Sequence, residues 1–415
     1  LPTVCAAPRA PRYTHSQLSS ALFLMTSALA DAAPLRTTHR TVSLLAAAAF
    51  LGGAGLRICD GLLPRLARDF RVTAGVAGQV VLAFSIAYGG MQLVFGPLGD
   101  RFGKARMVCW AVFGCAVLAL VAALAPDFST LLAARVGWGM AAAGVIPLAM
   151  AWIGDAVSLS ERQPTLARLL TGMLSGLMAG QLAGGLFGDS DLGWRGAFML
   201  MAAGYALVGA LLLMRLRSIS AASPPAAADP VPAHRQWRLV LSSPWSWSVL
   251  SAAAAEGVFL LGPMAYLPAM LHQRFALSLS AASAMLSLYA VGGLVYAISA
   301  RLLVQRLGQR RMVRAGGWLM GLGYLAWLVS PVMWTAGPVA LLVGFGTYLY
   351  HNTLQTHATQ MAPSARGTAV SLFAFCLFSG QALGVSLAGL AFDRMGLAMV
   401  LGASALALPL IGMGF

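Results

Sequence analysis

The sequence predicts an all-α polytopic membrane protein with twelve transmembrane helices in two pseudo-symmetric six-helix bundles. Of the 415 residues, 59% are hydrophobic and only 9% are charged, which is far more apolar than an ordinary soluble domain. Apolar runs of about 20 residues, the length that crosses roughly 30 Å of hydrocarbon, recur along the chain. In addition, part of the sequence nearly repeats itself about 205 residues later.

Twelve apolar runs can be drawn, and each is expected to be a helix because a helix satisfies its own backbone hydrogen bonds in hydrocarbon. They cover residues 41–64, 73–98, 107–125, 130–153, 165–188, 196–214, 244–270, 279–303, 313–331, 335–359, 367–391 and 397–415. We expect the following domains: a disordered cytoplasmic tail (1–40), an N-terminal six-helix bundle (41–214), a polar, proline-rich cytoplasmic linker (215–243) and a C-terminal six-helix bundle (244–415).

The net charge of +15 could indicate nucleic-acid binding, but the positions of the charges argue against it. If the N-terminus is inside, most Lys and Arg residues fall in the tail and in the loops on that side. Those on the opposite side are Arg65, Arg68, Arg71, Arg195, Arg274 and Arg394. This asymmetry is the positive-inside bias. It predicts a multi-pass protein of the plasma (inner) membrane with both termini in the cytoplasm.

The turn between the second and third runs combines glycine with charge. It contains Gly96, Gly99, Asp100, Arg101, Gly103, Lys104 and Arg106. Glycine permits backbone shapes that other residues resist, so a tight cationic turn is expected here.

The same pattern returns in the second half of the chain. Arg306-Leu-Gly308 follows Arg101-Phe-Gly103, although Gln305 stands where the first copy has Asp100. Two further pairs repeat at similar offsets: Leu63-Pro64 with Leu267-Pro268, and Gly180-Gln181 with Gly380-Gln381. Repeated halves with a site between them are typical of transporters.

These residues resemble the major facilitator superfamily. The turn Gly96 to Arg106 is similar to its loop 2–3 signature, and Arg135-Val-Gly-Trp-Gly139 is similar to its helix 4 signature. Within the superfamily, the chain looks most like the bacterial twelve-helix drug:proton antiporter group. That resemblance implies alternating access by rocking of two bundles, coupled to protons. Gln181 replaces the proline of the antiporter signature in helix 5, which leaves the direction of transport open.

Few ionisable residues lie inside the predicted spans, where each costs about 2.5–3.5 kcal/mol to insert. Arg57 and Asp60 are three positions apart and share a helix face. Arg135 falls at a similar depth in the fourth run. We hypothesise that Asp60 takes up protons and that both arginines pair with it. The alternative is a permanent ion pair that clamps the first and fourth helices together.

Glu256, near the middle of the seventh run, is the second candidate, for protons or for a cationic substrate. His351 lies in an unusually polar tenth run and could join a proton relay. The plainer interpretation of Glu256 is a neutral, hydrogen-bonded carboxyl. The plainer interpretation of the tenth run is that its polar residues only line a cavity.

The resemblance also implies a gating role for Asp100, Lys104 and Asp155; the alternative is that these charges only set topology. Glycines recur every four residues in the fifth run, at Gly172, Gly176, Gly180, Gly184 and Gly188. They predict tight helix packing, or a seam along which this helix slides against the second half.

The sequence carries no phosphate-binding loop, metal constellation or nucleophile triad, so we expect no enzyme activity and no cofactor. The expected partners are a small-molecule substrate, protons and the bilayer, with a monomeric chain. We predict proton-coupled efflux of small amphipathic molecules. The alternatives are proton-coupled import of a small metabolite such as an organic acid, and a non-transporting membrane sensor.

Overall fold

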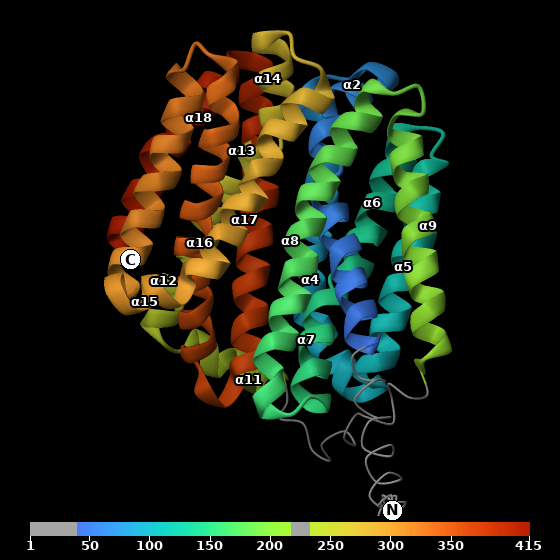
Figure 1. Ribbon diagram of the computed structural model, residues 1–415, viewed down its shortest axis with the longest axis vertical. Coiled ribbons are helices and arrows are strands. Elements are labelled where there is room, and N and C mark those ends of the chain that lie inside the picture. Colours follow the sequence, from blue (N-terminus) through green and yellow to red (C-terminus); the bar gives the residue numbers. More distant parts are fainter. Residues whose placement is uncertain (1–39, 217–232) are drawn as a thin grey trace, which may run out of the picture.

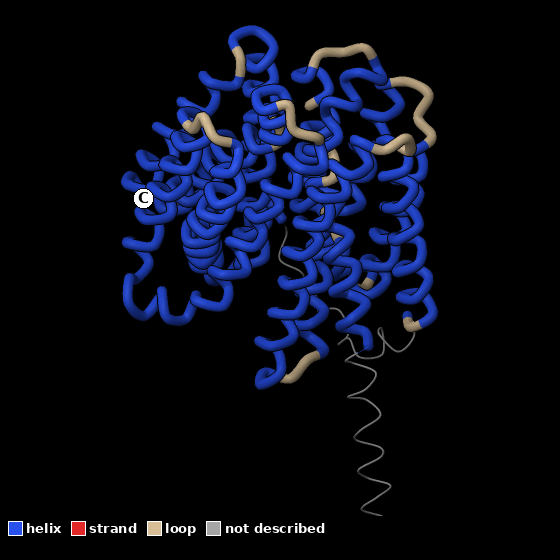
Figure 2. The backbone as a smooth tube through the Cα atoms, turned by 45° about the horizontal axis from the view of Figure 1, so that its top comes forward, coloured by secondary structure: helices blue, strands red, loops and turns tan. Residues whose placement is uncertain are grey.

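The computed structural model describes residues 40–216 and 233–415, and the regular structure within those ranges is helical, without a strand (Figure 2). Ten helices in the described ranges are long and apolar enough to cross a membrane. The predicted tail up to residue 39 and linker residues 217–232 lie outside these ranges. The rest of the linker is partly helical: Ala233–Leu241 form α11, although we expected a linker there.

The first half contains the spans predicted for it. Its first span is Arg40–Phe70 and includes η1 (Asp60–Leu62) and α2 (Leu63–Phe70). The rest is formed by α3 (Ala74–Ala77), α4 (Gln79–Phe102), α5 (Lys104–Ala123), α6 (Phe128–Ala142), α7 (Val145–Ala156), α8 (Leu159–Asp189) and α9 (Gly193–Met214).

The second half follows the same plan. Its helices are α12 (Pro244–Glu256), η2 (Gly257–Leu261), α13 (Gly262–Met264), α14 (Leu267–Phe275), α15 (Leu279–Val329), η3 (Met333–Thr335), α16 (Ala336–Gln360), η4 (Pro363–Ala365), α17 (Arg366–Met395) and α18 (Leu397–Gly414). Since α15 is two helices joined across a kink at Gly308, it covers the eighth and ninth predicted runs. The tenth run is α16, whose polar residues keep it out of the ten apolar helices. The predicted fold class is confirmed.

Both halves interrupt their first span at the repeated Leu-Pro pair. In the first span, a 3-10 turn at Asp60–Leu62 precedes the restart at Leu63. In the second half, a π-helical turn and α13 precede the restart at Leu267. Proline is tolerated in the first turn of a helix because its missing N–H would have no partner there. The interruption places Arg57 and Asp60 at a break in the helix.

The regularly spaced glycines of α8 bring it against the first span. A Cβ on Gly172, Gly176, Gly180 or Gly184 would lie 2.5, 1.9, 2.3 or 2.2 Å from a carbonyl oxygen, those of Ala46, Phe50, Ala54 and Ile58 respectively. Tight packing is therefore confirmed. The predicted sliding seam against the second half is wrong for these four glycines, because their partner helix belongs to the same half.

The two halves lie side by side, as the change from blue-green to yellow-red shows (Figure 1). Between the halves, α4 packs along α17 and α8 along α15. We name the ends of the bundle by their turns. At the Gly103 end α4 meets α5, and at the Ser190 end α8 meets α9.

Candidate functional site

Arg57 and Asp60 form an ion pair inside the first half. Arg57 Nη1 lies 3.0 Å from Asp60 Oδ2, and the side chains are only 10% and 1% exposed. Arg57 also reaches the second half: its Nη2 is 3.3 Å from Met264 Sδ, and its guanidinium lies 5.8 Å from the centre of the Tyr289 ring. The pair therefore lies where the halves meet.

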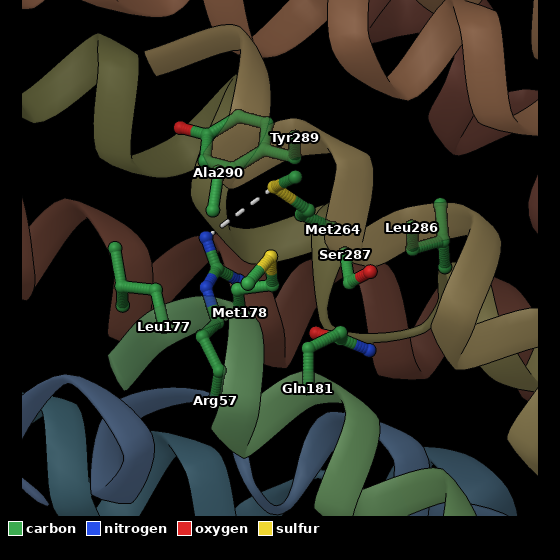
Figure 3. A pocket seen from close by; sticks show the side chains of 9 residues that line it. All are labelled: Arg57, Leu177, Met178, Gln181, Met264, Leu286, Ser287, Tyr289 and Ala290. Carbon is green, nitrogen blue, oxygen red and sulfur yellow. Dashed lines mark hydrogen bonds between the residues drawn. The ribbon is translucent and has the colours of Figure 1, made fainter. Parts of the chain in front are cut away.

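A small cavity surrounds the Arg57 side chain (Figure 3). It is lined from the first half by Arg57, Leu177, Met178 and Gln181, and from the second half by Met264, Leu286, Ser287, Tyr289 and Ala290. Gln181, the residue that departs from the antiporter signature, thus lines the same cavity as Arg57. Because both halves supply its walls, the shape of this cavity depends on how the halves sit against each other.

Arg135 forms no hydrogen bond or direct ion pair with Asp60 in this conformation, although the two buried charges still interact through space. Its Nε donates to the Val80 carbonyl at 3.2 Å, and its guanidinium lies 4.3 and 4.9 Å from the ring centres of Phe84 and Trp138. Aromatic faces attract such a cation. Arg135 Nη1 and Asp60 Oδ1 are nevertheless both buried without a hydrogen-bond partner. Each of the two groups thus keeps one unused polar atom.

Glu256 and His351 form a second buried pair, in the second half. His351 Nδ1 lies 3.0 Å from Glu256 Oε1, with the side chains 21% and 1% exposed. The imidazole also lies 5.5 Å from the ring centre of Phe373. The partner that Glu256 needs therefore comes from α16, 95 positions away in the chain. The sequence indicates both residues as candidates but does not indicate that they pair.

The charged turn at the Gly103 end brings its predicted residues together. Lys104 forms an ion pair with Asp155 of α7 and lies 4.0 Å from Asp100 Oδ1. Gly103 has φ of 88°, so the glycine permits the turn from α4 into α5. Arg101 and Arg106 are exposed beside it, and the Cβ of an alanine at Gly99 would meet the Leu148 side chain at 2.4 Å.

Two acids outside the set predicted from the sequence, Asp189 and Asp393, each bond to the opposite half. Their 204-residue spacing, which matches the internal repeat, was the available signal. No group of three or more His, Cys, Asp or Glu suited to a metal ion occurs in residues 40–216 and 233–415.

Residues 45–385 match the sequence model described as "Major Facilitator Superfamily". The chain is 23% identical over 344 residues to the "Uncharacterized MFS-type transporter YceJ" of Bacillus subtilis, covering 83% of this chain and 87% of that one. It is 33% identical over 91 residues to the "Multidrug efflux pump LfrA" of Mycolicibacterium smegmatis, covering 22% and 18% of the two chains.

Solved structures share the fold at low sequence identity. A D-xylose-proton symporter superposes with a TM-score of 0.73 at 13% identity, covering 90% of this chain and 94% of that one. A bacterial homologue of the lysosomal transporter Spinster, inward-facing and occupied, superposes with 0.71 at 18% identity, covering 90% and 95%. With its helical repeat, buried charge pairs and matching family model, this chain is a multi-pass membrane transporter of the major facilitator superfamily.

Proposed function

We propose that the protein exports small amphipathic molecules in exchange for protons, by alternating access. The observation that carries the proposal is the buried Arg57–Asp60 pair, which lies at the junction of the halves and touches Met264 of the second half. A buried carboxylate is retained at such cost mainly where it moves protons or binds a substrate. It is well placed to couple proton binding to movement of the halves.

The chemistry follows from the charges. Ionised Asp60 holds Arg57 by a charge-assisted hydrogen bond. A proton on Asp60 would cancel that attraction and leave the guanidinium held mainly by its contacts with the second half. Arg135, with Nη1 unused, is the second cation able to receive Asp60 when the halves move. Glu256 and His351, which pair within the second half, form a second pair of groups able to transfer protons.

The names of two partial relatives support export. Besides LfrA, the chain is 30% identical over 128 residues to the "Lincomycin resistance protein" of Streptomyces lincolnensis, covering 31% of this chain and 27% of that one. These matches are partial, so they favour the drug-exporting group as a proposal for this chain. The orientation we propose puts the Gly103 end and both termini in the cytoplasm of the plasma (inner) membrane, as the charge bias favours, with the protein working as a monomer.

In this orientation the charged turn acts as a cytoplasmic gate. Lys104 is held by Asp155 and Asp100, so the turn is anchored to α7. We propose that its residues, Gly96 to Arg106, rearrange when the cytoplasmic side closes. The charges then stabilise one conformation and do not contact the substrate.

Import of a small organic acid is the second candidate, because Arg57 presents a cation to the cavity. A "Probable L-galactonate transporter" of Escherichia coli is 22% identical over 308 residues, covering 68% of this chain and 66% of that one. The Arg57 guanidinium could bind the carboxylate of such an acid, and Gln181 and Ser287 could bind its hydroxyl groups.

Proton flux in inside-out vesicles tests the proposal. Lipophilic cations, antibiotics and organic acids are added to wild type, to Asp60→Asn and to Asp69→Asn, a matched control on the same span whose carboxylate pairs with Arg65 near the surface. If the protein exports, a lipophilic cation or an antibiotic should trigger proton release from wild-type vesicles. Asp60→Asn should abolish this release, and Asp69→Asn should retain it. Release that survives in Asp60→Asn would move the proton role to Glu256 or His351. Uptake of an organic acid together with protons into right-side-out vesicles would establish import instead.

A further inference from the structure

At the Ser190 end, a carboxylate of the first half binds the start of a helix in the second half. Asp189, the last residue of α8, accepts hydrogen bonds from the backbone N–H groups of Leu279 at 3.1 Å and Ser280 at 2.8 Å. These are the first two residues of α15. The first N–H groups of a helix have no partner within it and carry partial positive charge, so they favour a carboxylate.

A carboxylate of the second half does the same in the opposite direction. Asp393, in the last turn of α17, accepts from the N–H of Gly75 at 3.0 Å and from the Thr73 hydroxyl at 2.6 Å. Thr73 is the N-cap of α3, where the span Ala74–Phe102 begins. The two contacts together bond each half to the other.

The two contacts are copies of each other under the internal repeat. Asp189 and Asp393 are 204 positions apart, and the receiving residues Gly75 and Ser280, each second in its helix, are 205 positions apart. The spacing equals that of the repeated turns and Leu-Pro pairs. The arrangement is therefore built into both halves of the fold.

The backbone around Gly75 is packed so closely that the halves cannot separate there without breaking these bonds. A Cβ on Gly75 would lie 2.3 Å from Asp393 Oδ2 and 2.4 Å from the Gly389 carbonyl oxygen. Tyr266 Oη bridges the same place, 3.3 Å from the Gly75 carbonyl oxygen and 3.1 Å from that of Val385.

We propose that Asp189 and Asp393 form a pseudo-symmetric latch that holds the Ser190 end closed and must break each time the central cavity opens to that side. The latch rests on alternating access, a part of the proposed function, and is independent of substrate and of the direction of transport. Both carboxylates are exposed, so water replaces their bonds on opening. The latch therefore biases the equilibrium between closed and open forms and does not lock it.

Distances between spin labels across the Ser190 end test the latch in liposomes. Leu192 and Trp334, which are 69% and 68% exposed in opposite halves, become labelled cysteines after the five native cysteines are replaced. Asp189→Asn and Asp393→Asn should each raise the ratio of open to closed distances roughly two- to fivefold, the usual effect of losing a negative charge at a helix N-terminus. The double variant should show the product of the two single effects, roughly 4- to 25-fold, because separate contacts add in free energy.

Asp191→Asn is the matched control, since Asp191 is an exposed acid two positions from Asp189. It should leave the distances unchanged. Equal opening in this control, or unchanged distances in both latch variants, would overturn the latch. A second label pair at the Gly103 end, at exposed Glu161 and Gln309, separates the two hypotheses. Distances that never vary at either end, in acidic or alkaline buffer, would contradict alternating access. Distances that vary with conditions but are the same in wild type, Asp189→Asn and Asp393→Asn would reject only the latch.

Hydrogen exchange gives a local readout that does not depend on the labels. Asp189→Asn should speed exchange of the amides of Leu279 and Ser280, and Asp393→Asn that of Gly75. Faster exchange at those amides together with wider label distances supports the latch. Faster local exchange without wider distances would mean that the carboxylates only cap helices, and the latch would be rejected.

Discussion

Arg57 Nη1 and Asp60 Oδ2 lie 3.0 Å apart at the break in the first span, and both side chains are nearly inaccessible to solvent. The cation is turned toward the second half, whereas the carboxylate lies within the first. The pair therefore connects an ionisable carboxylate with the surface where the two bundles meet.

Breaking this pair from one side should destabilise the protein more than removing it whole. Arg57→Met leaves a buried, uncompensated carboxylate, a loss of about 3–5 kcal/mol. Arg57→Met combined with Asp60→Asn should recover most of it, as measured by thermal unfolding in detergent. The partly exposed Arg65–Asp69 pair is the comparison and should show a coupling of about 0.2–1 kcal/mol. A double variant as unstable as the summed single variants would contradict the interpretation.

The Glu256–His351 pair should respond asymmetrically. His351→Ala strands a carboxylate that is 1% exposed, whereas Glu256→Gln leaves an imidazole that is 21% exposed and can stay neutral. We expect the thermal midpoint of His351→Ala to fall further than that of Glu256→Gln. His351→Ala should lose about 3–5 kcal/mol of unfolding free energy, and Glu256→Gln about 1–3 kcal/mol. His351→Gln, which keeps a donor, should lie between them. The opposite order would show that Glu256 has another partner.

Gly176 should tolerate no side chain. The Cβ of Gly176→Ala would lie 1.9 Å from the Phe50 carbonyl oxygen, so α8 must move away from the first span. Overpacking a core usually lowers the free energy of unfolding by about 1–3 kcal/mol. Because this contact is with backbone, we expect a loss at or above the upper end of that range, or failure to fold. Gly154→Ala, which meets nothing within 4 Å, should be neutral or slightly stabilising. Fluorescence-detected chromatography of both variants, expressed in parallel, decides this.

The two repeated turns should share one conformational requirement. Gly103 and Gly308 have φ of 88° and 70°, whereas Gly96 in the same motif has no such φ. Gly103→Ala and Gly308→Ala should each cost about 1–3 kcal/mol of strain, and Gly96→Ala should not. Thermal midpoints of the three variants measure this. Equal effects in all three would show that strain is not the cause.

Asp127 predicts a pH dependence outside the membrane spans. It caps α6, accepting from the Thr130 backbone N–H at 2.8 Å and from its hydroxyl at 3.1 Å. These bonds, the backbone one foremost, hold the pKa of Asp127 below its ordinary value. Its stabilisation is therefore complete above the unfolded pKa of about 3.9 and is lost as pH falls through the lower folded pKa. The difference in thermal midpoint between wild type and Asp127→Ala should narrow in acid. Asp127→Asn, which cannot ionise, should show no such narrowing relative to Asp127→Ala.

Local relationships could be predicted from the sequence, and distant ones could not. Arg57 and Asp60 were paired correctly because a helix places residues three apart on one face. Arg135 was assigned to Asp60 from its depth alone, which does not determine the direction in which its helix faces. It binds Val80 and two aromatic rings instead. Glu256 was left without a partner because 95 residues separate it from His351.

By itself, the sequence determined the membrane class, the helical spans, the two-fold repeat and the glycine turns. Each of these follows from hydrophobic length, from short motifs that recur at a constant offset or from the conformational freedom of glycine, which are properties of short segments. The tertiary structure decided which charges meet, that Gly172, Gly176, Gly180 and Gly184 of α8 face the first span, and that Asp189 and Asp393 reach across the halves. The physical reason is that pairing in a helical bundle depends on how each helix is rotated and on how the two halves are juxtaposed. Both are set by packing across the whole molecule.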